Sequence, residues 1–214
     1  MIAQAYTTPL KTVTVYARLL KEAGLLTTGA RGRNAPDMTP LDAARLTLAM
    51  LTTDSPAESV ERVKRFGKIK YSPGYRRPVP GYETIQPERF ASLFQGETLE
   101  DVLAFMFSLP AVMGFNECCT WFNKNVFHLR VLDFSVLAEL YQHKFEGSEV
   151  VGELVVPFKG QVMVESEGTF EHVQGFSPIK GGIQTTRVIG GTSFLSIGIG
   201  LLENDDARIA AGDV

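Results

Sequence analysis

Three helix starts of one kind stand in the first third of the sequence. Each is a hydroxyl residue followed directly by proline: Thr8-Pro9, Thr39-Pro40 and Ser55-Pro56. The hydroxyl oxygen can accept a bond from an unpaired N–H group of the first helical turn. Proline costs nothing at the first helical position, because its missing N–H would have no partner there. The pattern therefore predicts helices over about 9–23, 40–52 and 56–66.

The first of these helices separates apolar from cationic side chains. Spacings of three and four place an apolar group on its inner face: Val13, Tyr16, Ala17 and Leu20. The opposite face carries Lys11, Thr14, Arg18 and Lys21. A helix can lie in the major groove of DNA while its cations neutralise phosphates, so we expect Arg18 to reach a guanine edge and Thr14 a phosphate or a thymine methyl group. The alternative is the solvated side of a surface helix.

Charge is distributed unevenly along the chain. Residues 1–90 carry 14 Lys and Arg against 8 Asp and Glu, whereas the other 124 residues carry 7 against 16. An asymmetry of this size between two parts of a chain indicates that the basic part contacts nucleic acid or a membrane surface. We therefore expect double-stranded DNA as the partner of the basic part, and a protein partner or self-association for the acidic part.

Two more basic segments flank the predicted helices. The loop Arg31-Gly32-Arg33 is similar to the core of the AT-hook, with the following proline displaced to Pro36, and its arginines suit a minor groove. A later cluster consists of Lys64, Arg65, Lys68, Lys70, Arg76 and Arg77. It is interleaved with Tyr71, Tyr75 and Tyr82, and we expect phosphate contacts for the charges and packing for the rings. An ordinary exposed loop is the alternative for the arginine segment.

The order of these features resembles a known DNA-binding family. A helix, then Ala23-Gly24-Leu25-Leu26, a basic glycine-rich loop and a new helix resemble the later part of a winged helix-turn-helix module, over roughly residues 9–53. The segments 16–26, 31–36 and 38–44 also resemble uncharacterised proteins of bacteriophages and prophages. The resemblance implies a three-helix DNA-binding module in a phage context and fixes no activity.

The rest of the chain predicts an α+β protein with a mainly antiparallel sheet. We expect a helical DNA-binding module over 1–70, a Pro- and Gly-rich basic linker over 71–89, an acidic mixed domain over 90–202 and a loose polar tail over 203–214. A helix is predicted over 98–109. The segment 134–144 fits a helix or a strand, and the spacing of Leu137, Leu140 and Tyr141 favours the helix. Strands are predicted over 126–132, 150–158, 161–165, 185–189 and 193–202. Gly181-Gly182 and Gly190-Gly191 are interpreted as turns between strands, with no helix after them to receive a phosphate.

No motif in the sequence points to catalysis or a cofactor. Two interpretations of Glu165, Glu167 and Glu171 stay open, a divalent-ion site of the kind that nucleases use and an acidic surface, and the acidic surface is favoured. The histidines, at positions 128, 143 and 172, lie in no catalytic motif. Cys118 and Cys119 are adjacent, whereas zinc sites usually place cysteines two to four residues apart, so inert core thiols are expected. No secretory signal or membrane span is visible, and a cytoplasmic or virion-associated protein without structural disulfides is predicted.

These observations favour a phage-type DNA-binding protein of regulatory type that is not an enzyme and that forms a homo-oligomer. Two alternatives stay open. One is a DNA-packaging subunit similar in role to a small terminase. The other is a virion structural or assembly protein whose β domain packs against neighbouring subunits. Two observations distinguish these three functions. A dimer favours regulation and a ring favours packaging, whereas recovery from virus particles favours a structural role.

Overall fold

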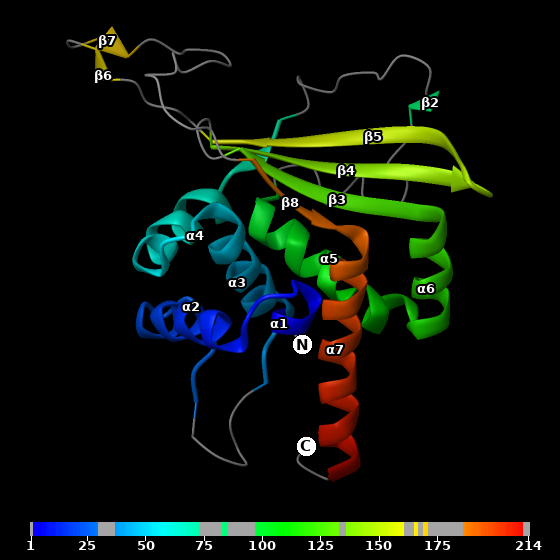
Figure 1. The fold of residues 1–214 in the computed structure, drawn as a ribbon, viewed down its shortest axis with the longest axis horizontal. Helices are drawn as coiled ribbons and strands as arrows, with labels where there is room; N and C mark the ends of the chain where they lie inside the picture. The colour runs from blue at the N-terminus through cyan, green and yellow to red at the C-terminus, as the bar shows by residue number, and fades with distance from the viewer. Residues whose placement is uncertain are drawn as a thin grey trace.

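A β-sheet with helices packed against one of its faces forms the molecule (Figure 1). The structure, a computed structural model, describes residues 2–29, 37–72, 83–84, 97–132, 136–160, 165–166, 169–170 and 186–211. The main strand pairs are antiparallel. The α+β class with a mainly antiparallel sheet is thereby confirmed. The other half of the prediction, a winged-helix module, concerns the connection between the N-terminal helices, part of which lies outside the described residues.

The three predicted N-terminal helices are present. They are α2 (Leu10–Glu22), α3 (Pro40–Thr52) and α4 (Ser59–Gly67), preceded by a short α1 (Ile2–Ala5). Of the three expected caps, the one at Thr39 is confirmed, because its Oγ accepts from the Asp42 N–H at 3.1 Å and its own N–H donates to Asp42 Oδ2 at 2.9 Å. The other two were wrong: the Thr8 Oγ donates to the Tyr6 carbonyl, and Ser55 precedes the 3-10 turn η1 (Pro56–Glu58) without a side-chain cap.

The sheet is built mainly from three long strands. These are β3 (Asn125–Leu132), β4 (Leu137–Glu146) and β5 (Glu149–Lys159), with β1 (Lys70–Tyr71), β2 (Glu83–Thr84) and β8 (Thr186–Gly190) beside them. The order is β1-β5-β4-β3-β8, and β2 pairs with β5 in parallel. A separate pair consists of β6 (Glu165–Ser166) and β7 (Thr169–Phe170). The strands predicted at 126–132, 150–158 and 185–189 are confirmed; of 161–165, residues 161–164 lie outside the described residues.

The helix predicted over 134–144 was wrong, because most of this segment is strand β4. Ala138, Leu140 and Gln142 point to the helical side of the sheet and are buried, which is a period of two. The polar Gln142 hides that alternation in the sequence. It is buried because its Nε2 donates to Asn125 Oδ1 on the neighbouring strand at 2.8 Å.

The strand predicted over 193–202 and the loose tail after it were also wrong. Residues 193–202 and 203–211 belong to the long helix α7 (Gly191–Ala211), whereas 212–214 lie outside the described residues. Because α7 begins directly after β8, Gly190-Gly191 is a strand-to-helix junction and not a turn between strands. The buried residues Phe194, Ile197 and Leu201 follow a helical period. Gly198 belongs to the same face, where a Cβ atom would lie 2.8 Å from the Phe107 carbonyl oxygen. Glycine is therefore a close-packing residue here, although its local signal favours a turn or strand.

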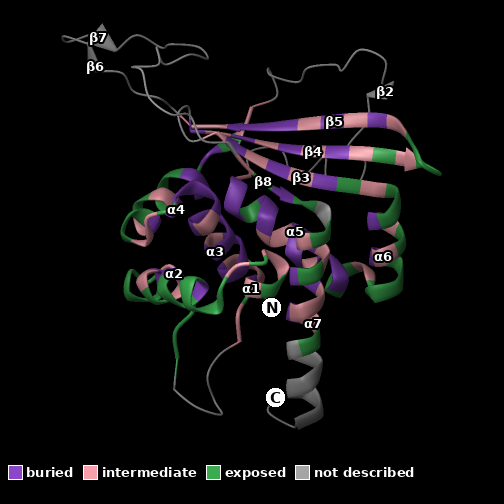
Figure 2. Cartoon of the chain, viewed as in Figure 1, coloured by how far each residue is buried: buried purple, intermediate pink, exposed green. Residues whose placement is uncertain are grey.

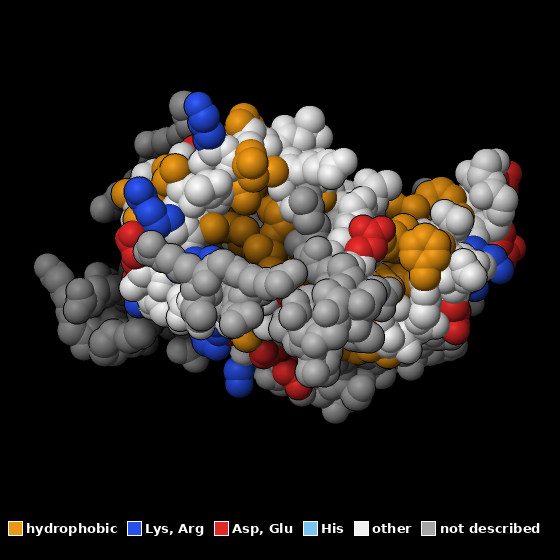
Figure 3. Space-filling view, turned by 90° about the horizontal axis from the view of Figure 1, so that it is seen from below, with side chains coloured by type: hydrophobic (Ala, Val, Ile, Leu, Met, Phe, Trp, Pro, Cys, Tyr) orange, Lys and Arg blue, Asp and Glu red, His pale blue; other side chains and the backbone are white. Residues whose placement is uncertain are grey.

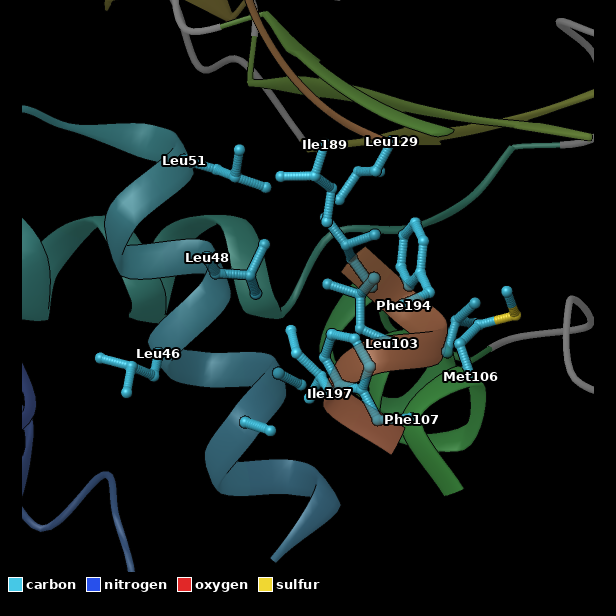
Figure 4. Packing of buried hydrophobic residues seen from close by; sticks show 14 of the residues in the cluster. Leu46, Leu48, Leu51, Leu103, Met106, Phe107, Leu129, Ile189, Phe194 and Ile197 are labelled. Carbon is cyan, nitrogen blue, oxygen red and sulfur yellow. The ribbon is translucent and has the colours of Figure 1, made fainter. Parts of the chain in front are cut away.

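The remaining helices connect the N-terminal part to the sheet. The predicted helix at 98–109 is confirmed as α5 (Leu99–Met113), with a capping box between Thr98 and Asp101, and α6 (Phe115–Lys124) follows it. In the close-up of Figure 4, side chains from α3, α5 and α7 meet under the sheet. The labelled members are Leu46, Leu48, Leu51, Leu103, Met106, Phe107, Leu129, Ile189, Phe194 and Ile197.

The hydrophobic core does not stop at the boundary expected near residue 70. One cluster of buried residues contains members of α2, α3 and α4 together with members of α5, α7 and the sheet. The backbone joins the two parts as well, because the Leu99 N–H donates to the Ile69 carbonyl at 2.9 Å. Tyr71, the expected first residue of the linker, pairs with Phe158 as part of β1. The helices expected to bind DNA therefore pack directly on the rest of the fold.

Candidate nucleic-acid interface

The outward face of α2 presents the cations that the sequence pattern predicts. Val13, Tyr16 and Leu20 are buried on the inner side. The Tyr16 hydroxyl donates to the Thr53 carbonyl at 2.8 Å, at the end of α3. Because these contacts fix the rotation of the helix about its axis, the opposite side points to solvent, as the exposed outer surface of α2 in Figure 2 shows. Its members Lys11, Thr14, Arg18 and Lys21 are all exposed.

Two of these four side chains have partners on the same helix. The Thr14 hydroxyl donates to the Leu10 carbonyl at 2.8 Å, which leaves its oxygen able to accept. Arg18 Nε lies 3.8 Å from Glu22 Oε1, with about two thirds of both side chains exposed (66% and 65%). An exposed pair of this kind contributes about 0–1 kcal/mol. A phosphate group can therefore replace Glu22 as the partner of Arg18 at small cost.

Helix α4 adds two more cations beside α2. Val63 and Phe66 are buried, which turns Lys64 and Arg65 in the last turn of the helix toward solvent. Helices α2 and α4 pack against each other and lie at the same end of the molecule (Figure 1). On the underside in Figure 3, Lys and Arg side chains stand separately toward this end, with acidic side chains among them. The positive charge is thus spread over two helices and does not form one dense patch.

Lys68 and Lys70 are placed differently from the other predicted contacts. Lys68, just after α4, donates to Oε1 of the buried Glu100. Glu100 also accepts from Arg45 Nε at 3.0 Å. Burial raises the pKa of the Glu100 carboxyl, but the bonds and charges of Arg45 and Lys68 outweigh it and hold this pKa below its usual value. Lys70 is exposed in β1, which is a strand of the sheet and not part of α2 or α4. Lys68 is therefore the exposed partner of a buried carboxylate, Glu100, which joins α3 to α5 through Arg45.

Four predicted contact residues cannot be placed. Arg31 and Arg33 in the glycine-rich loop, and Arg76 and Arg77 in the expected linker, lie outside the described residues. The candidate interface defined by the structure consequently consists of the α2 and α4 side chains. We call these the α2–α4 face: Lys11, Thr14, Arg18, Lys21, Lys64 and Arg65.

Sequence reasoning missed a polar cluster on the sheet face that points away from the helices. The ring centroids of His128 and Tyr141 are 4.6 Å apart, and those of His128 and His143 are 5.2 Å apart, with the rings stacked. His143 Nε2 lies 2.9 Å from Glu153 Oε2. Burial, followed by the neighbouring His143, lowers the pKa of His128, so it is uncharged at neutral pH. Only the strand register, which pairs His128 with Tyr141 and His143 with Glu153, brings these residues together.

Cys118 and Cys119 lie on α6, where the first is buried and the second is partly exposed. Cys118 is buried, and burial raises the pKa of its thiol to about 11, as expected for an inert core cysteine. Across the described segments, no three His, Cys, Asp or Glu side chains are arranged to hold a metal ion. None of the helices in the described ranges is both long and apolar enough to cross a bilayer.

Comparison with known proteins gives no family model that matches the chain, no similar curated protein and no similar solved structure.

Proposed function

We propose that the protein binds double-stranded DNA through the α2–α4 face, with α2 in or along the major groove and α4 beside it on a phosphate backbone. The observation that carries the proposal is the fixed rotation of α2. Buried Tyr16 and Leu20 on one side hold Lys11, Arg18 and Lys21 on the other, all exposed. A row of cations on a rigid helix suits a polyanion, because each neutralised phosphate releases bound counterions.

The arrangement at the amino end supports a helix-turn-helix interpretation. Helix α1 is followed by the turn Tyr6-Thr7-Thr8-Pro9 and then by α2, which corresponds to the order of a first helix, a tight turn and a recognition helix. In such a module the recognition helix reads base edges and its neighbours hold the backbone. Arg18, in the middle of the exposed face, is then the residue that contacts a guanine edge, and Lys11 and Lys21 contact phosphates.

The proposal also fits a regulatory protein of the phage type that the sequence resembles. The α2–α4 face is formed on the same hydrophobic core as the sheet, so a change elsewhere in the fold can reach it through direct packing. Packed side chains of this kind can carry coupling between a sensing part and a binding part.

The test compares two double variants that remove the same charge from opposite ends of the molecule. Arg18→Ala with Lys21→Ala alters the α2–α4 face. Lys124→Ala with Lys144→Ala removes two exposed lysines near the far ends of α6 and β4. We expect the first pair to weaken duplex binding at least about tenfold. The slope of log K against log salt should fall by about 1, since Lys21 is the phosphate contact of the pair and each lost phosphate contact changes the slope by about 0.9. The second pair should leave both quantities nearly unchanged.

Two results contradict the proposal. One is the absence of binding by the unaltered protein to random and genomic duplexes at low salt. The other is an equal loss in both double variants, which would mean that net charge, not the α2–α4 face, determines binding.

A further inference from the structure

A hollow of about 430 Å³ lies between the turn that precedes α2, the end of α3 and the start of α7. This volume is in the range of small-molecule sites, about 300–1,000 Å³. The hollow lies at an edge of the sheet, because β8 is the last strand in the order and contributes Arg187 and Ile189 to its wall. It is separate from the α2–α4 face and from the ring cluster on the sheet.

The wall of the hollow is chemically divided. One part is apolar and includes Met50, Leu51 and Ile189. The other part includes the hydroxyl residues Thr7, Thr8 and Ser193 and the cation Arg187. A ligand that fits both parts has an apolar body of a few carbon atoms and one anionic end. Polar surface predominates in the hollow, so the anionic end of the ligand makes most of the contacts with the wall.

Arg187 is held in place while keeping hydrogen-bonding capacity. Its side chain is 19% exposed, Nη1 donates to the Leu51 carbonyl at 3.3 Å, and Nη2 donates to Asp54 Oδ2 at 2.6 Å. Within the described residues these bonds use two of the five N–H donors of a guanidinium group. The Asp54 side chain is 88% exposed. Its carboxylate therefore contributes little to the packing of the fold and competes with a ligand carboxylate for Arg187.

The hollow is connected to α2 through the turn that forms part of its wall. Thr7 has φ +51°, a conformation that a β-branched residue rarely adopts. Tyr6 fixes one side of the turn through a 2.7 Å bond between its hydroxyl and the Thr47 hydroxyl on α3. Ser193 Oγ donates to the Ala5 carbonyl at 3.1 Å, which joins the start of α7 to the end of α1. A ligand that contacts Thr7, Thr8 and Ser193 therefore acts on the segment that positions the proposed recognition helix.

We propose that this hollow binds a small amphipathic organic anion, of the monocarboxylate class, and that its occupation changes the DNA affinity of the α2–α4 face. The ligand carboxylate accepts from Arg187 and from the Thr7 hydroxyl, since the Thr8 and Ser193 hydroxyls already donate to backbone carbonyls, and its chain lies against Met50, Leu51 and Ile189. The claim that the hollow binds an anion depends on the hollow alone. The claim that binding regulates DNA affinity rests on the proposed function.

Direct binding is measured first, by calorimetry on the full chain without DNA. The probe is hexanoate, with hexylammonium as a probe of similar size and opposite charge. Hexanoate should bind at least about tenfold more tightly than hexylammonium. Arg187→Gln should weaken hexanoate binding at least tenfold. Asp54→Asn should strengthen it severalfold, because it removes the competing carboxylate from an exposed position. Unchanged affinity in either variant, or equal binding of the two probes, overturns the proposed site.

Regulation is measured second, as duplex affinity at constant ionic strength with and without saturating hexanoate. We expect at least a fivefold change, within the usual range of coupling between two sites, and the same factor in the reciprocal experiment with hexanoate titrated into the DNA complex. Hexanoate that binds without altering duplex affinity overturns the regulatory half. A chain that binds no duplex under either condition refutes the proposed function instead, while the calorimetric result still decides the site.

Discussion

The buried carboxylate of Glu100 should be one of the most sensitive single positions in the fold. The perturbation is Glu100→Gln, which keeps the shape of the side chain and removes its charge. Glu100 is 3% exposed and accepts from Arg45 and Lys68. Arg45 also donates to the Leu25 carbonyl at 2.9 Å, so the cluster connects the end of the α2 region, α3 and α5. A glutamine amide would place an N–H group against one of these two cations.

The expected cost follows from the exposure of each partner. The Arg45 side chain is 20% exposed, and a hydrogen bond between charged groups at such a site contributes about 1.5–3 kcal/mol. The Lys68 side chain is 66% exposed, and solvent screening limits its pair with Glu100 to about 0–1 kcal/mol. We therefore expect a loss of about 1.5–4 kcal/mol at pH 7. For a chain of this size that corresponds to a fall in Tm of about 10 °C.

The pH dependence provides an independent check of the same reasoning. Because the pKa of Glu100 is lower in the folded state than in the unfolded state, its stabilisation is present above the unfolded value, about 4.3. It is lost as the pH falls through the folded value. The free energy of unfolding of the unaltered protein should therefore fall more steeply than that of Glu100→Gln below about pH 4.5.

The assay is urea unfolding followed by circular dichroism at several pH values, with Glu61→Gln as the matched control. Glu61 is exposed on α4, and its change to glutamine should alter the free energy of unfolding by less than about 0.5 kcal/mol. A loss below about 1 kcal/mol for Glu100→Gln at pH 7, or parallel pH profiles for the two variants, would refute the reasoning.

Two further predictions concern packing and thiol chemistry. Gly198→Ala should destabilise the fold by about 1–3 kcal/mol despite the better helix propensity of alanine, because the new Cβ would lie 2.8 Å from the Phe107 carbonyl oxygen and the Pro110 ring. Thermal unfolding measures this change. A stabilised variant would contradict the close contact between α5 and α7. Alkylation by iodoacetamide at pH 8 should modify Cys119 well before Cys118, whose pKa of about 11 leaves about one thiolate in a thousand. Mass spectrometry of the native protein measures the labelling rate. If a Cys119→Ser variant is labelled as fast as the unaltered protein, Cys118 is accessible and the prediction is wrong.

Local signals in the sequence predicted the features whose causes are local. The cap at Thr39 and the helix over 98–109 follow from side chains that bond to backbone groups three residues away. The cationic face of α2 follows from the helical period alone, because a helix with one apolar stripe must turn its other side to solvent. The sequence therefore determined which side of α2 carries Lys11, Arg18 and Lys21.

Tertiary structure decided every feature that depends on a partner distant in sequence. Strand β4 was predicted as a helix because its alternation is hidden by Gln142, which is buried through a bond to Asn125. The start of helix α7 was predicted as a strand because Gly198, which lies against α5, has no local helical signal. The pairing of Lys68 with Glu100 and the stack of His128 on Tyr141 likewise depend on helix packing and strand register. Local bonds are set by neighbours in the chain, whereas burial, charge pairing and the hollow at Arg187 are set by which elements meet, and that is fixed only when the core forms.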